Sequence, residues 1–109
     1  MINIEEFKKL ELKLGQILSA EKVPDTDKLL KLSVDMGEEL PRTIVSGIAE
    51  YFPDETSLIN KKVMFVANLE PRTIKGIESQ GMILALSTEE GGFSLLSPLN
   101  DLPAGTKAR

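Results

Sequence analysis

Hydrophobic and polar residues alternate along most of the chain, with the period of two that is typical of β-strands. The clearest example spans residues 28–37, where Lys31 falls on the polar face. The apolar face of this segment repeats at every second residue, at Leu30, Leu32, Val34 and Met36. Such a pattern predicts a strand with one face in a core and the other in solvent.

A longer alternating run precedes it, at residues 10–23, and is interrupted by Gly15, after which the apolar phase shifts. A glycine with a phase change inside a long strand predicts a β-bulge or a sharp coil, as at a barrel corner. Residues 3–11 begin with Asn3, followed by acidic and then basic residues. That order predicts one or two helical turns capped by Asn3.

The remaining apolar runs are shorter and are separated by turn residues. Proline and glycine in residues 71–80, "PRTIKGIESQ", predict a loop between two hydrophobic strands. Turns about every 8–12 residues, with strand signals outnumbering helix signals, indicate a small all-β barrel or sandwich. The strands are expected at residues 42–47, 62–69, 81–87 and 93–98, and a short helix is expected at residues 53–58.

The order of these elements matches the five-stranded OB-fold barrel, in which a long bent first strand is followed by a hairpin pair, a short helix and closing strands. We therefore predict an all-β fold of this kind. A short helix lies between strands 3 and 4, short extensions lie at both termini, and residues 1–109 form a single domain. The predicted core includes Leu30, Leu32, Val34, Val63, Phe65, Ile83 and Ala85.

The amino-acid composition excludes several kinds of chemistry and adds little to the prediction of the fold. The chain has neither cysteine nor histidine, which excludes disulfides, thiolate chemistry and histidine-based acid–base catalysis. Its carboxylates stand in turns or beside lysines, and Ser46 lacks the preceding glycine of a nucleophile elbow. We expect no enzymatic activity, no metal and no cofactor.

No apolar run approaches the ~20 residues needed to cross a bilayer, and the charged N-terminus is unlike a signal peptide. The expected location is therefore the cytoplasm, without membrane association. A net charge of −4 opposes non-specific binding to nucleic acids. It does not oppose a local basic patch, because salt screens charges beyond about 8 Å.

One stretch concentrates the groups such a patch needs. Arg72 and Lys75 lie in the predicted loop between two hydrophobic strands, where binding groups are common. Met82 is out of phase with Ile83, so it either points outward or fills the core. OB barrels bind oligonucleotides on strands 2 and 3 and the adjoining loops, which places Lys31 on the same predicted surface. That surface lacks aromatic residues, which favours recognition of a folded RNA by shape and backbone contacts over base stacking.

Four segments also carry a resemblance to a known family. They are "DKLLKLSVDMGEE" (27–39), "RTIVSGIAEYF" (42–52), "INKKVMFVANLEPRTIKGIESQGMILAL" (59–86) and "LPAGTKAR" (102–109). They resemble the tRNA-binding domain found at the C-terminus of bacterial methionyl-tRNA synthetases, in stand-alone tRNA-binding proteins and in cytokine-like synthetase cofactors. The resemblance implies an OB fold, affinity for the folded tRNA body and no catalysis by this module.

Carried over by position, the RNA-facing residues of that family correspond to Lys31, Asn68, Arg72, Lys75, Ser79 and Met82. Ser46 also matches and is expected to brace the barrel. Glu70 departs from the pattern, because many relatives are expected to have a lysine there, and Glu78 lies beside Ser79. Both carboxylates weaken the local positive field. The resemblance further implies a homodimer formed through the terminal segments 4–12 and 93–105, and an attached synthetase body remains open. A rival interpretation is a chaperone-like dimer of the same fold that binds peptides in a hydrophobic surface pocket.

Overall fold

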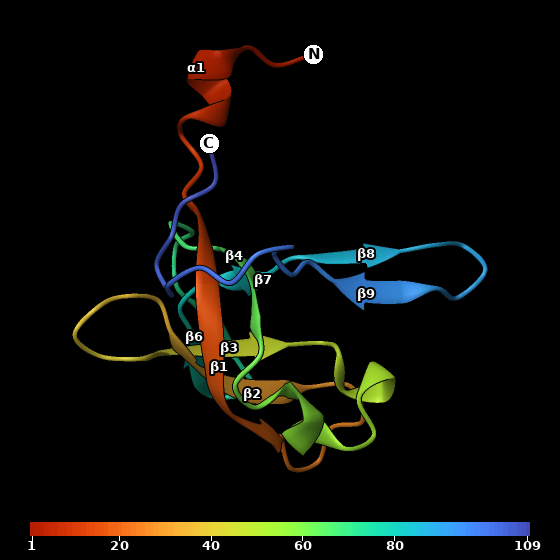
Figure 1. The fold of residues 1–109 in the computed structure, drawn as a ribbon. Coiled ribbons are helices and arrows are strands. Elements are labelled where there is room, and N and C mark those ends of the chain that lie inside the picture. The colour runs from red at the N-terminus through yellow and green to blue at the C-terminus, as the bar shows by residue number, and fades with distance from the viewer.

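A computed structural model describes all residues from 1 to 109 and shows an all-β architecture (Figure 1). Five antiparallel strands pair in the order β3-β2-β1-β4-β7 and curl into a nearly closed barrel, which confirms the predicted OB-like fold. These strands are β1 (Leu12–Lys22), β2 (Leu30–Asp35), β3 (Arg42–Ser46), β4 (Lys62–Val66) and β7 (Met82–Ile83).

Short helical pieces and two ribbons complete the chain. Helix α1 (Ile4–Phe7) begins at Asn3, whose side chain accepts a hydrogen bond from the Glu6 amide in a capping box, as predicted. The short helix expected at residues 53–58 is a 3₁₀ turn, η2 (Glu55–Leu58). The other pieces are η1 (Ala49–Tyr51) and two hairpins, β5 (Arg72–Ile74) with β6 (Ile77–Ser79), and β8 (Ala85–Ser87) with β9 (Phe93–Leu95).

The core lies inside the barrel and has Phe65 near its centre. The period-two pattern of β2 is confirmed, because Leu30, Leu32 and Val34 are each 0% exposed and Lys31 between them is partly exposed. Val63, Phe65 and Ile83 are buried as predicted. The prediction for Ala85 is wrong. The expected strand at residues 81–87 breaks after Ile83, and Ala85 is exposed in the separate β8–β9 ribbon.

Gly15 has a different role from the predicted one. It pairs regularly with Val63 on β4, and the irregularity in the β1–β2 register lies between Ile17 and Ser19. A Cβ atom on Gly15 would lie 2.6 Å from Val34 Cγ1 and 2.7 Å from Phe65 Cε1. The glycine is therefore required by the close approach of core side chains, and the bulge follows a few residues later.

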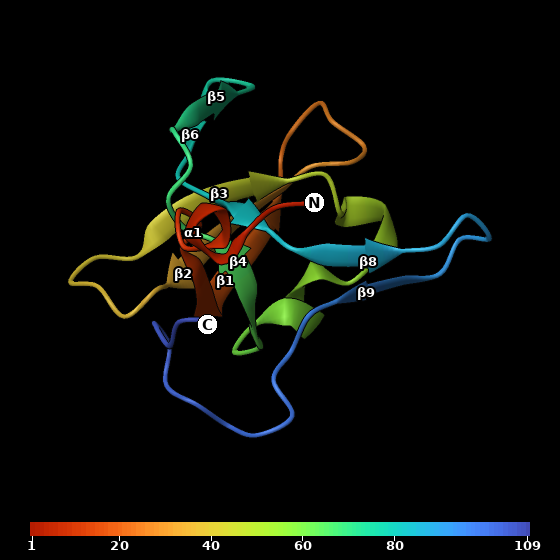
Figure 2. The same cartoon turned by 90° about the horizontal axis from the view of Figure 1, so that it is seen from above.

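The predicted loop at residues 71–80 is in fact a hairpin. Strands β5 and β6 pair from Arg72 opposite Ser79 to Ile74 opposite Ile77. The connecting residues, Lys75 and Gly76, have φ angles of 50° and 78°. Two consecutive positive φ values match the two-residue turn that suits the twist of a β-hairpin. The hairpin stands away from the barrel (Figure 2).

The barrel closes between β3 and residues 79–80, which we call the seam. The Val45 amide donates to Ser79 Oγ at 2.9 Å, and the Thr43 amide donates to Gln80 Oε1 at 3.0 Å. The Gln80 amide donates in return to the Thr43 carbonyl at 2.8 Å. Two side chains thus replace acceptors that a fully paired strand would supply, which explains why two polar residues occupy this position.

The two ends of the chain lie together at one pole of the barrel (Figure 1). The Leu14 amide donates to the Thr106 carbonyl at 2.8 Å, and the Ala108 amide donates to the Leu12 carbonyl at 2.8 Å. The C-terminal residues thus form an added edge beside the start of β1.

Replacing Gly15 by alanine tests the packing around it. Because the new Cβ would overlap side chains of the core, we expect the free energy of unfolding to fall by about 1–3 kcal/mol. The matched control is Gly47→Ala, since Gly47 is exposed and nothing lies within 4 Å of a Cβ built there. Urea denaturation measures both variants. Equal stability of the two would contradict the packing role of Gly15.

Candidate nucleic-acid interface

Three of the predicted site residues meet at the base of the β5–β6 hairpin. Arg72, Ser79 and Met82 line one depression of about 60 Å³. Met82 is 46% exposed, so it points outward. We call this site the hairpin depression; it is also lined by Val45, Leu69, Glu70, Ile74 and Gly81.

Two further predicted residues border this depression. Lys31 on β2 pairs with Val45 on β3, which itself lines the depression, so Lys31 lies one strand away. Lys75 occupies the turn of the hairpin and is exposed. A positive φ is unfavourable for a lysine and natural for glycine or asparagine. The lysine is therefore held at this tip in a strained conformation, a kind of strain that clusters at functional sites.

These three cations are among the seven, of thirteen in the chain, that form no ion pair. Lys31, Arg72 and Lys75 form no ion pair, whereas Lys13, Lys22, Arg42 and Lys62 each lie within 4.0 Å of a carboxylate. The three unpaired cations are available to a phosphate without loss of an existing partner. Glu70 in the depression and Glu78 on β6 reduce the local positive potential, as the sequence suggested.

Ser79 is the most buried of the predicted site residues. Only 4% of it is exposed, and its hydroxyl accepts from the Val45 amide and donates to the Gly81 carbonyl at 3.3 Å. The hydroxyl is thus committed to the seam. Ser46, for which bracing was expected, is partly exposed at the end of β3, and its hydroxyl makes no hydrogen bond. Ser79 performs the bracing in its place.

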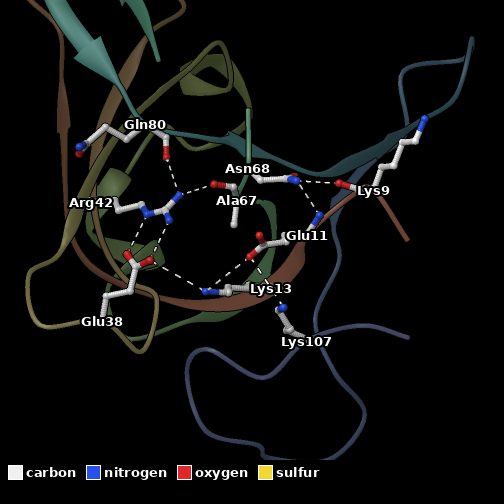
Figure 3. A network of polar contacts seen from close by, with 9 residues as sticks. All are labelled: Lys9, Glu11, Lys13, Glu38, Arg42, Ala67, Asn68, Gln80 and Lys107. Atoms are coloured by element: carbon white, nitrogen blue, oxygen red, sulfur yellow. Dashed lines mark hydrogen bonds and ion pairs between the residues drawn. The ribbon is translucent and has the colours of Figure 1, made fainter. Parts of the chain in front are cut away.

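Asn68 does not itself line the hairpin depression, although it directly precedes Leu69, which does. Its side chain anchors the N-terminal segment (Figure 3). Its Nδ2 donates to the Lys9 carbonyl at 2.7 Å, and its Oδ1 accepts from the Glu11 amide at 2.9 Å. The side-chain amide of Asn68 thus has two backbone partners in the N-terminal segment.

Arg42 is a central polar residue that the sequence analysis missed. Its guanidinium donates to both carboxylate oxygens of Glu38 at 2.8 Å, and also to the carbonyls of Ala67 and Gln80 (Figure 3). The hydrogen bonds from Arg42 hold the pKa of the Glu38 carboxyl below its ordinary value. The hydrogen bonds with Glu38 raise the pKa of Arg42. The sequence does not indicate this role for Arg42, because its carbonyl partners, Ala67 and Gln80, are distant from it along the chain.

The chain contains no cluster of three or more acidic, cysteine or histidine side chains suited to a metal ion. None of its helices has the length and apolar character needed to span a bilayer.

A family model described as "Putative tRNA binding domain" matches residues 12–107. The chain belongs to this tRNA-binding domain family. Methionine–tRNA ligase of Deinococcus radiodurans is 46% identical over 109 residues, which is the whole of this chain and 16% of the ligase. The chain thus spans about one sixth of the length of that curated relative.

Solved structures agree with the family assignment. A MetRS-related protein from Pyrococcus horikoshii superposes with a TM-score of 0.91 at 41% identity, covering 100% of this chain and 98% of that one. The chaperone CsaA from Bacillus anthracis has a TM-score of 0.87 at 30% identity, covering 100% of this chain and 99% of that one. The tRNA-binding domain described here therefore shares its barrel with proteins named for two different activities.

Replacing Ser79 by alanine separates the structural use of this hydroxyl from a direct RNA contact. The change leaves the Val45 amide without its acceptor, so we expect the free energy of unfolding to fall by about 1–3 kcal/mol. Ser46→Ala is the matched control, because that hydroxyl has no partner to lose. Unchanged stability of Ser79→Ala together with weakened tRNA binding would identify the hydroxyl as an RNA contact instead.

Proposed function

We propose that residues 1–109 form one domain that binds the folded body of tRNA without catalysing a reaction. The observation that carries this proposal is the group of unpaired cations, Lys31, Arg72 and Lys75, around the hairpin depression. They stand on a barrel of the tRNA-binding family. Each of these side chains can approach a phosphate. The net negative charge of the chain discourages non-specific binding of polyanions elsewhere on the surface.

The chemistry of this surface favours shape recognition. The hairpin depression contains no aromatic side chain, so bases are not stacked there. Contacts to phosphates and ribose hydroxyls across a folded RNA need only cations and polar groups at fixed separations. In this proposal Met82 and Arg72 form the rim that touches the RNA. Ser79 holds the hairpin at the angle that presents them, and Asn68 contributes through the N-terminal segment.

We propose further that the domain works in the cytoplasm with a methionyl-tRNA synthetase, either attached to its catalytic body or as a separate protein. The support is the similarity to a methionine–tRNA ligase over a region that is 16% of that ligase, and to a MetRS-related protein over almost its whole length. A module of this kind would raise the affinity for tRNA, because tethering converts a second contact into an intramolecular one.

A homodimer is the expected assembly. Helix α1 projects from the barrel (Figure 1), and Ile2, Ile4 and Leu10 are between 45% and 65% exposed. A hollow of about 400 Å³ between α1 and the C-terminal residues is lined by apolar side chains that include Phe7 and Leu12. Contiguous exposed apolar surface marks interaction sites on soluble proteins. We infer that a second copy covers this pole.

A chaperone-like peptide-binding dimer is the alternative function. It is favoured by the similarity to CsaA and by a larger, partly apolar pocket elsewhere on the barrel, lined by Tyr51 and Phe93 among others. A mobility assay that compares bulk tRNA with an unfolded apolar polypeptide distinguishes the two functions.

Charge-removing variants test the proposed interface. We expect Arg72→Gln and Lys75→Gln each to weaken binding of bulk tRNA, and to lower the slope of log affinity against log salt by about one. Lys22→Gln is the control, because Lys22 is already 3.8 Å from a Glu55 carboxylate oxygen and bonded to the Pro53 carbonyl. Filter binding at several salt concentrations measures the slopes. Parental slopes in both hairpin variants would move the site elsewhere.

The dimer is tested by placing a charge on α1. Ile4 is 61% exposed within one chain, so Ile4→Glu is tolerated by the isolated barrel. Buried in an interface, the same charge is costly to desolvate. We expect the parent to sediment as a dimer at tens of micromolar and Ile4→Glu as a folded monomer with lower tRNA affinity. A monomeric parent would contradict the proposed assembly.

A further inference from the structure

Residues 68–79 leave the barrel wall between β4 and β7 and contain the β5–β6 hairpin. The segment follows Ala67 and returns to the wall at Gln80, which bonds to β3. Most of the predicted RNA-facing residues lie in it, namely Asn68, Arg72, Lys75 and Ser79. The groups that fix the two ends of this segment therefore determine how its side chains are presented.

The two ends of the segment meet at one side chain. The β4–β7 ladder stops at Val66 opposite Met82, so Ala67 and Gln80 lie just beyond its last pair. Their carbonyls both accept from Nη1 of Arg42, that of Gln80 at 3.2 Å (Figure 3). Two carbonyl oxygens cannot hydrogen-bond to each other, because both are acceptors. The donor between them joins the two ends where the ladder has stopped.

Glu38 fixes the direction in which Arg42 donates. Its two carboxylate oxygens accept from Nε and Nη2 of Arg42, each at 2.8 Å. This bidentate pairing holds the plane of the guanidinium, so that Nη1 is directed at the two carbonyls. Four hydrogen bonds thus engage a side chain that has five N–H donors and is 22% exposed. Arg42 is therefore not available to a phosphate.

We propose that Arg42 is a positioning residue of the tRNA interface and that Glu38 is the partner that orients it. By joining the ends of residues 68–79, Arg42 holds Arg72 and Met82 at the separation at which they meet the RNA. The RNA touches neither Arg42 nor Glu38. Without this tie the hairpin samples more conformations in the free protein, and tRNA binding has to order it at a cost in affinity. This inference rests on the proposed function, because it concerns how the same interface is held.

The same substitution at the two arginines tests this role. Arg42→Lys keeps the charge and loses the planar fork, because an ammonium donates from a single point. We expect it to bind bulk tRNA roughly three- to tenfold more weakly, with an unchanged slope of log affinity against log salt. Arg72→Lys is the matched control and should stay within about twofold of the parent, since a lysine still pairs with a phosphate as a point charge. Filter binding measures both variants, and parental affinity of Arg42→Lys would overturn the inference.

Glu38→Gln gives a test of opposite sign. Removing a carboxylate raises the positive potential, which by charge alone strengthens binding of a polyanion. Positioning requires the reverse, because a glutamine cannot accept both hydrogen bonds of the fork, and we expect tRNA affinity to fall roughly three- to tenfold. Glu89→Gln is the matched control, since Glu89 is exposed in a turn and its carboxylate forms no ion pair; its affinity should not fall. Equal or tighter binding by Glu38→Gln would contradict the orienting role.

Amide hydrogen exchange separates positioning from a general loss of stability. In Arg42→Lys the ratio of exchange rates, residues 73–78 over β2, should rise about threefold or more, because the hairpin opens locally. Gly15→Ala weakens the core away from the hairpin, so it should lower this ratio and keep parental tRNA affinity. An unchanged or lower ratio in Arg42→Lys would mean that Arg42 only stabilises the barrel, and would overturn the inference.

The outcomes distinguish this inference from the proposed function. If Arg72→Gln lowers the salt slope while Arg42→Lys and Glu38→Gln bind like the parent, the positioning role is overturned and the tRNA function stands. If Arg42→Gln lowers the slope by about one, Arg42 contacts a phosphate directly and does not act through the hairpin. If the parent binds no tRNA, the function fails, and the exchange ratio still decides whether Arg42 holds the hairpin.

Discussion

The seam between β3 and residues 79–80 determines the geometry of this barrel. A five-stranded sheet curled this tightly cannot pair β3 and β7 along their whole length, because β7 has only two residues, Met82 and Ile83. Side chains of Ser79 and Gln80 accept from the β3 amides instead. Unpaired amides in this position would cost about 1–3 kcal/mol each, so two hydrogen-bonding side chains preserve a closed barrel where the strand is too short.

The seam also explains the position of the functional candidates. The same Ser79 that closes the barrel pairs with Arg72 across the β5–β6 hairpin, so the hairpin is attached to the barrel wall through its last residue. Arg42 fixes the other end of the seam by binding the Ala67 and Gln80 carbonyls. Arg42 is thus engaged by protein groups, whereas Arg72 is exposed and forms no ion pair. This contrast distinguishes a structural cation from a candidate binding cation.

The sequence predicted those elements whose signal lies within a short stretch of the chain. Period-two burial located β2, and the capping residue Asn3 located α1, because both signals are local. Pairing between distant segments was not predictable in this way. A lysine in the hairpin turn replaces the usual asparagine, which concealed β5 and β6. Ala85 is outside the core because it begins the β8–β9 ribbon, where it pairs with Leu95.

The same limit applies to the candidate site. The positions of Arg72, Ser79 and Met82 in one depression agree with the segment that drew attention in the sequence, and their role in binding stays a prediction. Asn68 is not among the lining residues, and its amide holds the main chain at Lys9 and Glu11. Arg42 was missed because its carbonyl partners, Ala67 and Gln80, are separated from it by many residues in the sequence.

The attachment of the β5–β6 hairpin has a kinetic consequence. A two-stranded hairpin is marginally stable by itself, and beyond Arg72 and Ser79 this one holds only its own short ladder. Its amide hydrogens should therefore exchange with solvent through local opening, far faster than those of β1 and β2, which open only with the whole barrel. A ligand that binds Lys75 must immobilise the β5–β6 hairpin, so part of the binding free energy offsets the loss of conformational entropy of the hairpin. Slower amide exchange of residues 73–78 on binding would measure this ordering directly.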